Sequence, residues 1–187
     1  MKRILFPCLV LSVLFSSCIG VDSKITISRD GSGAITVQYR VPEELQALGE
    51  LDGNESRPTV PVGQLDIRRG VDRIEGLSLE SFSEKRDGRD RVYSLSLAFT
   101  SMDALTAFLN NSLGSAVLDR NSLSLSLSSG GKIDSDLSGL VRQQSSGYTF
   151  RLSVQSSLGG DTKKFEYEIP MDELLLSENP VRLDIEI

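Results

Sequence analysis

Few residues of this sequence could carry out chemistry. Each of them lies in a short pattern that lacks the other residues or motifs normally found with it. Ser129 and Lys132 have the S-x-x-K spacing of a serine–lysine dyad, in which the lysine activates the serine for attack on an acyl group. Such a dyad occupies the first turns of a helix, and the S-D-N and K-T-G motifs that accompany it do not occur in the sequence. We therefore interpret residues 129–132 as a solvent-exposed loop between a strand and a helix.

Two other short patterns resemble ligand-binding loops. Residues 52–56 resemble the start of a calcium loop, but Arg57 stands where that loop needs glycine, and no glutamate closes it at position 63. A single loosely bound calcium ion is the alternative to an ordinary loop there. Gly31-Ser32-Gly33 follows a predicted strand, as a phosphate-binding loop does, yet a second strand follows it instead of a helix. A hairpin turn explains these glycines better.

The first residues have the order of a secretory signal peptide. Lys2 and Arg3 form a short basic region, and an apolar stretch runs from Ile4 to Phe15. That stretch is too short to cross a bilayer as a helix, which needs about 20 residues. We therefore predict that residues 1–17 are a signal peptide.

The residues that follow resemble the lipobox of bacterial lipoproteins. Phe15-Ser16-Ser17-Cys18 has small residues before the cysteine, although Phe15 stands where that family usually has leucine. Relaxed lipoboxes of this kind resemble those of spirochaete lipoproteins. The resemblance implies diacylglycerol on the Cys18 thiol, cleavage before it, and a lipid anchor on the exported face of the cell membrane or outer membrane. The alternatives are an ordinary signal peptide with an incidental cysteine, or an uncleaved anchor.

The composition of the mature chain narrows its chemistry further. The sequence has 187 residues, no histidine and two cysteines, Cys8 and Cys18, so a lipidated mature chain would have no free thiol. It could form no disulfide, no Cys/His metal site and no cysteine nucleophile. Loss of Lys2 and Arg3 leaves 18 basic against 26 acidic residues, a net charge of −8. An acidic domain repels nucleic acid. We therefore expect that the protein binds no cofactor and no nucleic acid, and that it is not an enzyme.

Apolar and polar residues alternate with period two along most of the mature chain, which predicts half-buried strands. We expect an α+β fold, mainly antiparallel β-sheet built from hairpins, with two or three short helices packed on one face or end. Residues 18–23 would be the lipidated cysteine and a tether, and residues 24–187 a single domain. The strands are predicted at 25–27, 35–41, 77–82, with a bulge before Phe82, and at 93–99, 123–127, 148–154, 165–169 and 183–187. The helices are predicted at 63–75, at 101–109 with Ser101 as the cap, and at 133–141, and a short turn at 43–48 is a further helical candidate.

Two clusters of arginine stand out against the acidic composition. One lies on the predicted helix at 63–75 and one in the polar turn at 85–91. Either could contact an anionic headgroup or a sugar phosphate, but acidic neighbours nearly cancel both, so we interpret them as solvated, self-paired surface. The basic residues are Arg68, Arg69, Arg73, Arg86, Arg89 and Arg91, and the acidic neighbours are Asp66, Asp72, Asp87 and Asp90.

The start of the mature chain, about residues 18–45, resembles the LppM-like family of bacterial lipoproteins. The shared features are a strand, an Asp-Gly-Ser-Gly turn and a second strand that ends Tyr39-Arg40-Val41-Pro42. Members of that family often carry a further membrane helix, whereas this sequence ends in an alternating segment at Ile187. The resemblance implies an α+β domain that binds envelope lipids or glycolipids. It transfers no functional residue.

Three hypotheses follow for the function. The first is a non-enzymatic binding or structural module of the cell envelope, for lipid or glycolipid, with an apolar groove lined by the helix at 102–109, Phe150 and Leu152, unless these form the core. The second is a protein-interaction, assembly or adhesin module that uses an open strand edge at Ile187. The third, a serine hydrolase, needs a serine beside a lysine inside a cleft.

Overall fold

The computed structural model describes residues 20–42, 64–112, 114–119, 122–127 and 135–187. This part of the chain contains nine strands and four helices, and the predicted α+β class is confirmed. The helical candidate at 43–48 lies outside the described residues.

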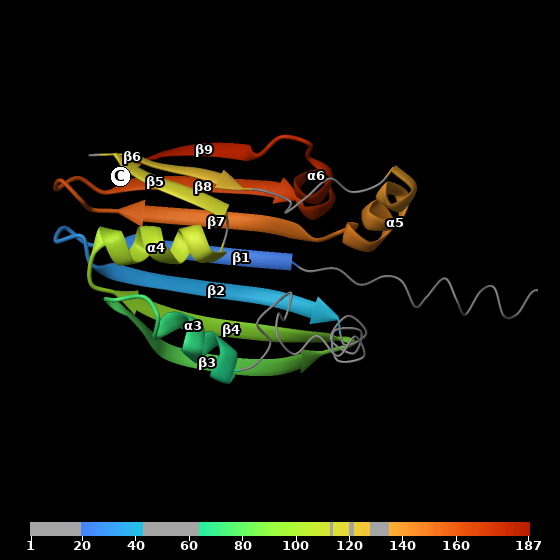
Figure 1. The fold of residues 1–187 in the computed structure, drawn as a ribbon, viewed down its shortest axis with the longest axis horizontal. Helices are drawn as coiled ribbons and strands as arrows, with labels where there is room; N and C mark the ends of the chain where they lie inside the picture. The colour runs from blue at the N-terminus through green and yellow to red at the C-terminus, as the bar shows by residue number, and fades with distance from the viewer. Residues whose placement is uncertain (1–19, 43–63, 113, 120–121, 128–134) are drawn as a thin grey trace, which may run out of the picture.

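A six-stranded sheet is the larger of two sheets (Figure 1). Neighbouring strands in it run antiparallel, with one exception, the parallel pair β1 and β7. The expectation of antiparallel hairpins is therefore only partly right. In spatial order the strands are β3 (Leu77–Asp87), β4 (Asp90–Phe99), β2 (Gly33–Pro42), β1 (Gly20–Ile27), β7 (Thr149–Ser156) and β8 (Lys163–Pro170).

The predicted tether at 18–23 is longer than the structure allows. Strand β1 begins at Gly20, and it lies between β2 and β7, so that it pairs on both sides. Ser23 is already buried, and it pairs with Val37 on one side and Leu152 on the other. Residues 20–23 belong to the sheet because both neighbours offer them backbone hydrogen-bond partners.

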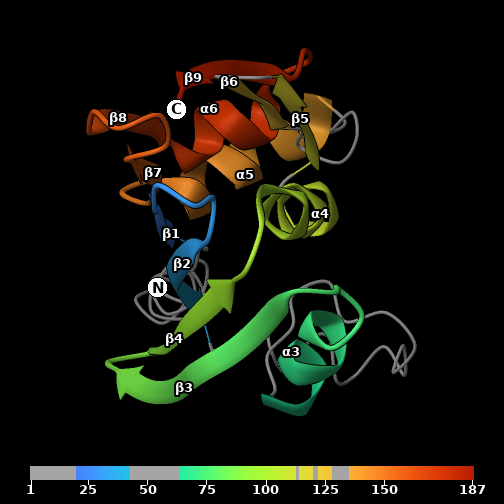
Figure 2. The same ribbon diagram turned by 90° about the vertical axis from the view of Figure 1, so that its left-hand side faces the viewer.

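A smaller antiparallel sheet and the helices lie over one face of the six-stranded sheet or at its end (Figure 2). Helices α3 and α4 contact strand β3, α6 contacts β7 and β8, and α5 packs on α6. The smaller sheet has the order β5 (Gly114–Asp119), β6 (Ser122–Leu127) and β9 (Val181–Glu186), and the helices are α3 (Gln64–Val71), α4 (Met102–Ser112), α5 (Ser135–Ser145) and α6 (Met171–Leu176).

One continuous hydrophobic core fills the space between these layers. Along β4, Leu95, Leu97 and Phe99 point into it, and the residues between them face outward. The same alternation holds in β6, where Leu123, Leu125 and Leu127 are buried. The period-two pattern therefore predicted the buried face of these strands correctly.

Local sequence signals account for several boundaries. Ser101 caps α4, as predicted, because its Oγ accepts a hydrogen bond from Ala104 N at 3.2 Å. The β1–β2 turn is closed by Asp30, whose Oδ1 accepts from Ser32 N at 3.0 Å. Gly31-Ser32-Gly33 therefore belongs to a hairpin turn.

The structure also corrects some predicted boundaries. The turn expected at 85–91 is shorter, since β3 continues to Asp87 and β4 begins at Asp90. A bulge between Leu79 and Ser81 interrupts β3, which confirms the irregularity expected there. Helix α3 ends at Val71, so the predicted helix at 63–75 is too long. Strand β5 and helix α6 were not predicted, and the described residues hold four helices where two or three were expected.

Candidate functional site

The residues with the clearest chemical signals fall outside the part that the structure describes. They are the predicted lipidation site Cys18, the S-x-x-K pattern at 129–132 and the calcium-like loop at 52–56. What the structure contributes is the surroundings of the point where Cys18 joins the fold.

The start of β1 lies at the same end of the sheet as the β3–β4 turn. Gly20 pairs with Arg40, Arg40 pairs with Val92, and Val92 pairs with Lys85. Cys18 precedes Gly20 by two residues, which span at most about 7 Å of chain. We call this end of the sheet, where β1 begins, the attachment end.

Ion pairs and hydrogen bonds link the strands at the attachment end. Arg40 Nη1 lies 2.8 Å from Asp87 Oδ2, and Arg91 pairs with Glu84. The Tyr148 hydroxyl donates to Asp90 Oδ2 at 3.3 Å. The self-pairing predicted for this turn is thus partly present, with Arg40 of β2 as a partner that the local sequence did not reveal. Exposed pairs of this kind contribute about 0–1 kcal/mol each to stability.

Beneath these charges the core contains an aromatic cluster. The rings of Tyr39 and Tyr93 stack with their centroids 5.1 Å apart, and Phe82 lies 6.2 Å from Tyr93. Burial raises the pKa of Tyr39 well above its ordinary value, so this phenol stays protonated at physiological pH. Both tyrosines are at most 7% exposed, and their role is to stabilise the sheet.

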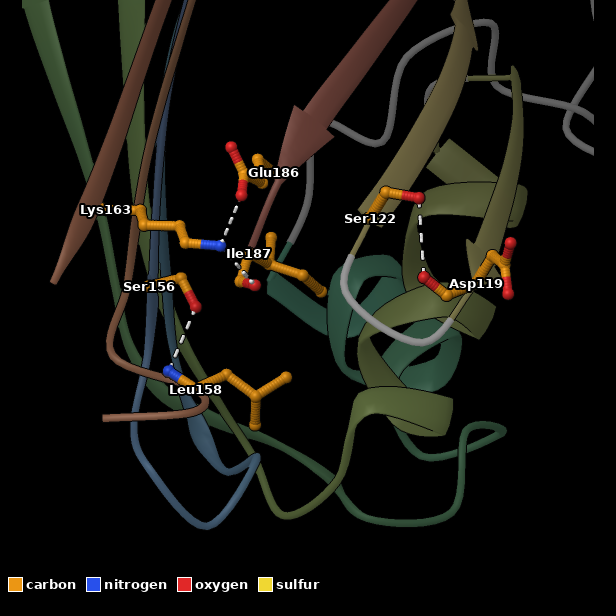
Figure 3. Close-up of polar contacts among 7 residues, drawn as sticks. All are labelled: Asp119, Ser122, Ser156, Leu158, Lys163, Glu186 and Ile187. Atoms are coloured by element: carbon orange, nitrogen blue, oxygen red, sulfur yellow. Dashed lines mark hydrogen bonds and ion pairs between the residues drawn. The ribbon is translucent and has the colours of Figure 1, made fainter. Parts of the chain in front are cut away.

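The hydrolase hypothesis can be examined where a serine and a lysine meet in the described structure. Ser156 and Lys163 are cross-strand neighbours in β7 and β8. Lys163 Nζ lies 2.7 Å from Glu186 Oε1 and 3.4 Å from Ile187 O, whereas Ser156 Oγ accepts from Leu158 N at 3.2 Å (Figure 3). A serine–lysine dyad needs a hydrogen bond between the two side chains. Here each side chain is bonded to other groups.

At each edge of the smaller sheet, a side chain forms a hydrogen bond with a backbone group. At β9, Lys163 Nζ donates to Ile187 O, and the same ammonium holds the pKa of Glu186 below its ordinary value. At β5, Ala116 N donates to Asn110 Oδ1 of α4 at 2.7 Å. An added strand would need these backbone groups. The contact at Ile187 O lies just past the end of β9, and β9 remains an edge strand of the smaller sheet.

The residues expected to line an apolar groove lie in the core. Phe150 and Leu152 are 3% and 1% exposed, and Leu105 and Leu109 of α4 belong to the same cluster. Their apolar surface is already in contact with other apolar side chains, so it is not available to a ligand. The core alternative to the groove is thus the correct one for these four residues.

Neither metal ligands nor membrane spans occur where the structure can be described. Over the described ranges, no three His, Cys, Asp or Glu side chains gather in a way that could hold a metal ion. The helices among those residues include none with the length and apolar character needed to cross a bilayer.

The chain was compared with known proteins. No protein-family model matches the sequence, and no curated protein matches it either. The resemblances to bacterial lipoproteins and to the LppM-like family therefore stay predictions.

Proposed function

We propose that this chain is a bacterial lipoprotein, and that its folded part is a non-enzymatic binding or structural module of the cell envelope. Residues 1–17 would be removed and Cys18 would carry the lipid. The observation that carries the proposal is the position of Gly20, where a central strand begins two residues after the lipobox cysteine. A signal peptide followed at once by a folded strand is what direct anchoring of a domain requires.

The short connection has a physical consequence for the anchored domain. The polar headgroup layer of a bilayer is about 5–8 Å thick on each side. A connection of at most about 7 Å would hold the start of β1 at that layer. Acyl chains contribute about 0.8 kcal/mol per buried CH₂, so two chains would make the attachment effectively permanent. The domain would act at the membrane surface and not as a freely diffusing protein.

The folded part favours a surface or structural role over an enclosed ligand. Phe150, Leu152 and the buried face of α4 belong to the core, so these residues do not form a groove for a lipid or glycolipid. Recognition of a protein partner through the edge of β9 stays the alternative, because β9 is an edge strand of the smaller sheet. The serine-hydrolase alternative gains no supporting contact from Ser156 and Lys163.

Phase partitioning with a non-ionic detergent tests the anchor. The full chain, expressed in a bacterium, is expected in the detergent phase, and Cys18→Ser in the aqueous phase. Cys8→Ser is the matched control, because Cys8 lies inside the predicted signal peptide and its loss should leave the partitioning unchanged. If Cys18→Ser entered the detergent phase as fully as the unaltered chain, the proposal would be wrong.

A further inference from the structure

The attachment end is unevenly charged. The segment Lys85–Arg91, which we call the basic tip, holds four basic and two acidic residues, in a mature chain predicted to carry −8. Across the sheet, the flank at β8 and α6 carries the acidic residues Glu168, Asp172 and Glu173. One end of the domain therefore has a basic side and an acidic side.

The acidic groups within the basic tip already have partners. Asp87 pairs with Arg40 at 2.8 Å, and Asp90 accepts a hydrogen bond from the Tyr148 hydroxyl at 3.3 Å. Arg86 and Arg89 are exposed. An exposed guanidinium can still donate to a phosphate, since it has five N–H donors and one contact uses only part of them.

The sheet register places the basic tip at the same end of the sheet as the start of β1. Gly20 is level with Val92 and Lys85, so residues 86–91 lie beyond that level, on the side from which the chain arrives. Strands β1 and β4 are separated by two strand spacings, about 10 Å. A headgroup layer that contains the lipidated cysteine therefore lies within reach of the tip.

We propose that the basic tip contacts the anionic headgroups of the membrane that holds Cys18, and that this contact tilts the domain so that the β3–β4 side lies lower than the α6 side. The inference rests on the proposed lipid anchor. It commits to a lipid surface as the partner, because the start of β1, two residues after the predicted anchor, and the basic tip lie at the same end of the sheet. The opposite end, with the β7–β8 turn, would then point away from the membrane.

The acidic residues of the segment 43–63 oppose this contact, because anionic headgroups repel them. That segment follows β2 at the attachment end, and it holds five acidic residues and one basic residue. The proposal therefore requires the local charge of the tip to decide the contact.

Single-cysteine labelling can test the tilt, because an acylated Cys18 leaves the mature chain without another thiol. The lipidated protein would carry a fluorophore at Ser83→Cys beside the tip, Glu173→Cys on the α6 side, or Asp161→Cys in the β7–β8 turn. The vesicles would be phosphatidylcholine alone, or mixed with phosphatidylglycerol, with a headgroup-attached quencher. We expect the strongest quenching at position 83, less at 173 and least at 161. Phosphatidylglycerol should increase quenching at 83, and 1 M salt should abolish that increase.

Two charge-reversal variants distinguish the contribution of the basic tip from that of the rest of the surface. Lys85→Glu with Arg89→Glu should remove most of the phosphatidylglycerol-dependent quenching at position 83, since each basic residue near an anionic surface favours contact roughly fivefold. Lys24→Glu with Lys164→Glu makes the same change in charge on the outer face and should leave the quenching unaltered.

The outcomes distinguish the two proposals. If the protein fails to float with vesicles of either composition, the lipid anchor itself is wrong. If it floats but positions 83 and 173 are quenched equally, or quenching at 83 ignores phosphatidylglycerol, only the role of the tip is wrong. In the protein with the unaltered tip, the lipid and salt dependence of quenching at position 83 already tests the role of the tip. The test therefore stands even if the double variant unfolds.

Discussion

The two faces of the six-stranded sheet come from the same strands and have opposite properties. On β4, Leu95 and Leu97 are buried, while Ser94 and Ser96 between them face outward. On β2, Ile35 is buried, while Thr36 and its neighbours Ala34 and Gln38 face outward. The comparison teaches that one face supplies the stability of the domain, and that the other is left for contact with its surroundings.

The outer face is itself divided. In one row over β3, β4 and β2 the side chains are neutral, since Ser83, Ser94 and Gln38 lie side by side. Over β1, β7 and β8 the same row continues as Asp22, Arg151 and Glu168, with alternating charge. Charges that alternate along a row can pair with each other, so this face has no large region of one sign.

The largest expected effect comes from adjacent residues on opposite faces. Leu97→Ala should lower the free energy of unfolding by about 2–5 kcal/mol, because it leaves a cavity in the core. Ser96→Ala, one residue earlier on the outer face, should change it by less than about 0.5 kcal/mol. Denaturant unfolding of both variants measures the difference. Similar losses of unfolding free energy in the two variants would mean that the two faces contribute more equally to stability than their burial indicates.

A glycine on the buried face should show a smaller loss. A Cβ on Gly33 would lie 2.0 Å from Thr26 O and 2.5 Å from Phe99 Cζ, so Gly33→Ala forces the hairpin apart. We expect a loss of about 1–3 kcal/mol. Gly70→Ala in α3 is the matched control, since nothing lies within 4 Å of its Cβ. It should gain about 0.5–1 kcal/mol from helix propensity, and an equal loss at both sites would contradict the close approach.

The smallest effect concerns the charged half of the outer face. The Arg151 guanidinium, 3.0 Å from Glu168, lowers the pKa of that carboxyl below its ordinary value. The pair therefore stabilises the fold above the unfolded pKa of glutamate, about 4.3, and this contribution disappears as the pH falls through the lower, folded pKa. Carboxyl NMR titration should show the pKa of Glu168 rising in Arg151→Gln. It should stay in place in Arg73→Gln, a distant control, and a shift there instead would argue against the pair.

Much of this arrangement could be predicted from the sequence because it is local. Alternation and a Gly-rich turn predict the hairpin of β1 and β2, and Ser101 predicts the start of α4. The parallel pairing of β1 with β7 could not be predicted, since the two strands are far apart in sequence and no local signal links them. Strand β5 has only Ala116 and Leu118 as alternating inward positions, too few to predict a strand.

The candidate site shows the same limit. The arginines at 86–91 are visible in the sequence, but their position at the same end of the sheet as the start of β1 follows from the register of β1, β2 and β4. Likewise, the pairing of Arg40 with Asp87 joins residues from different hairpins. No local pattern in the sequence reveals either arrangement.

Intact mass of the protein purified from its native membrane tests the central claim most directly. We expect a species that begins at Cys18 and carries added acyl mass, and we expect the acylated species to be lost in Cys18→Ser. An unmodified chain, cut at another position or not cut at all, would contradict the lipoprotein assignment, and the inferred orientation on the membrane would fall with it.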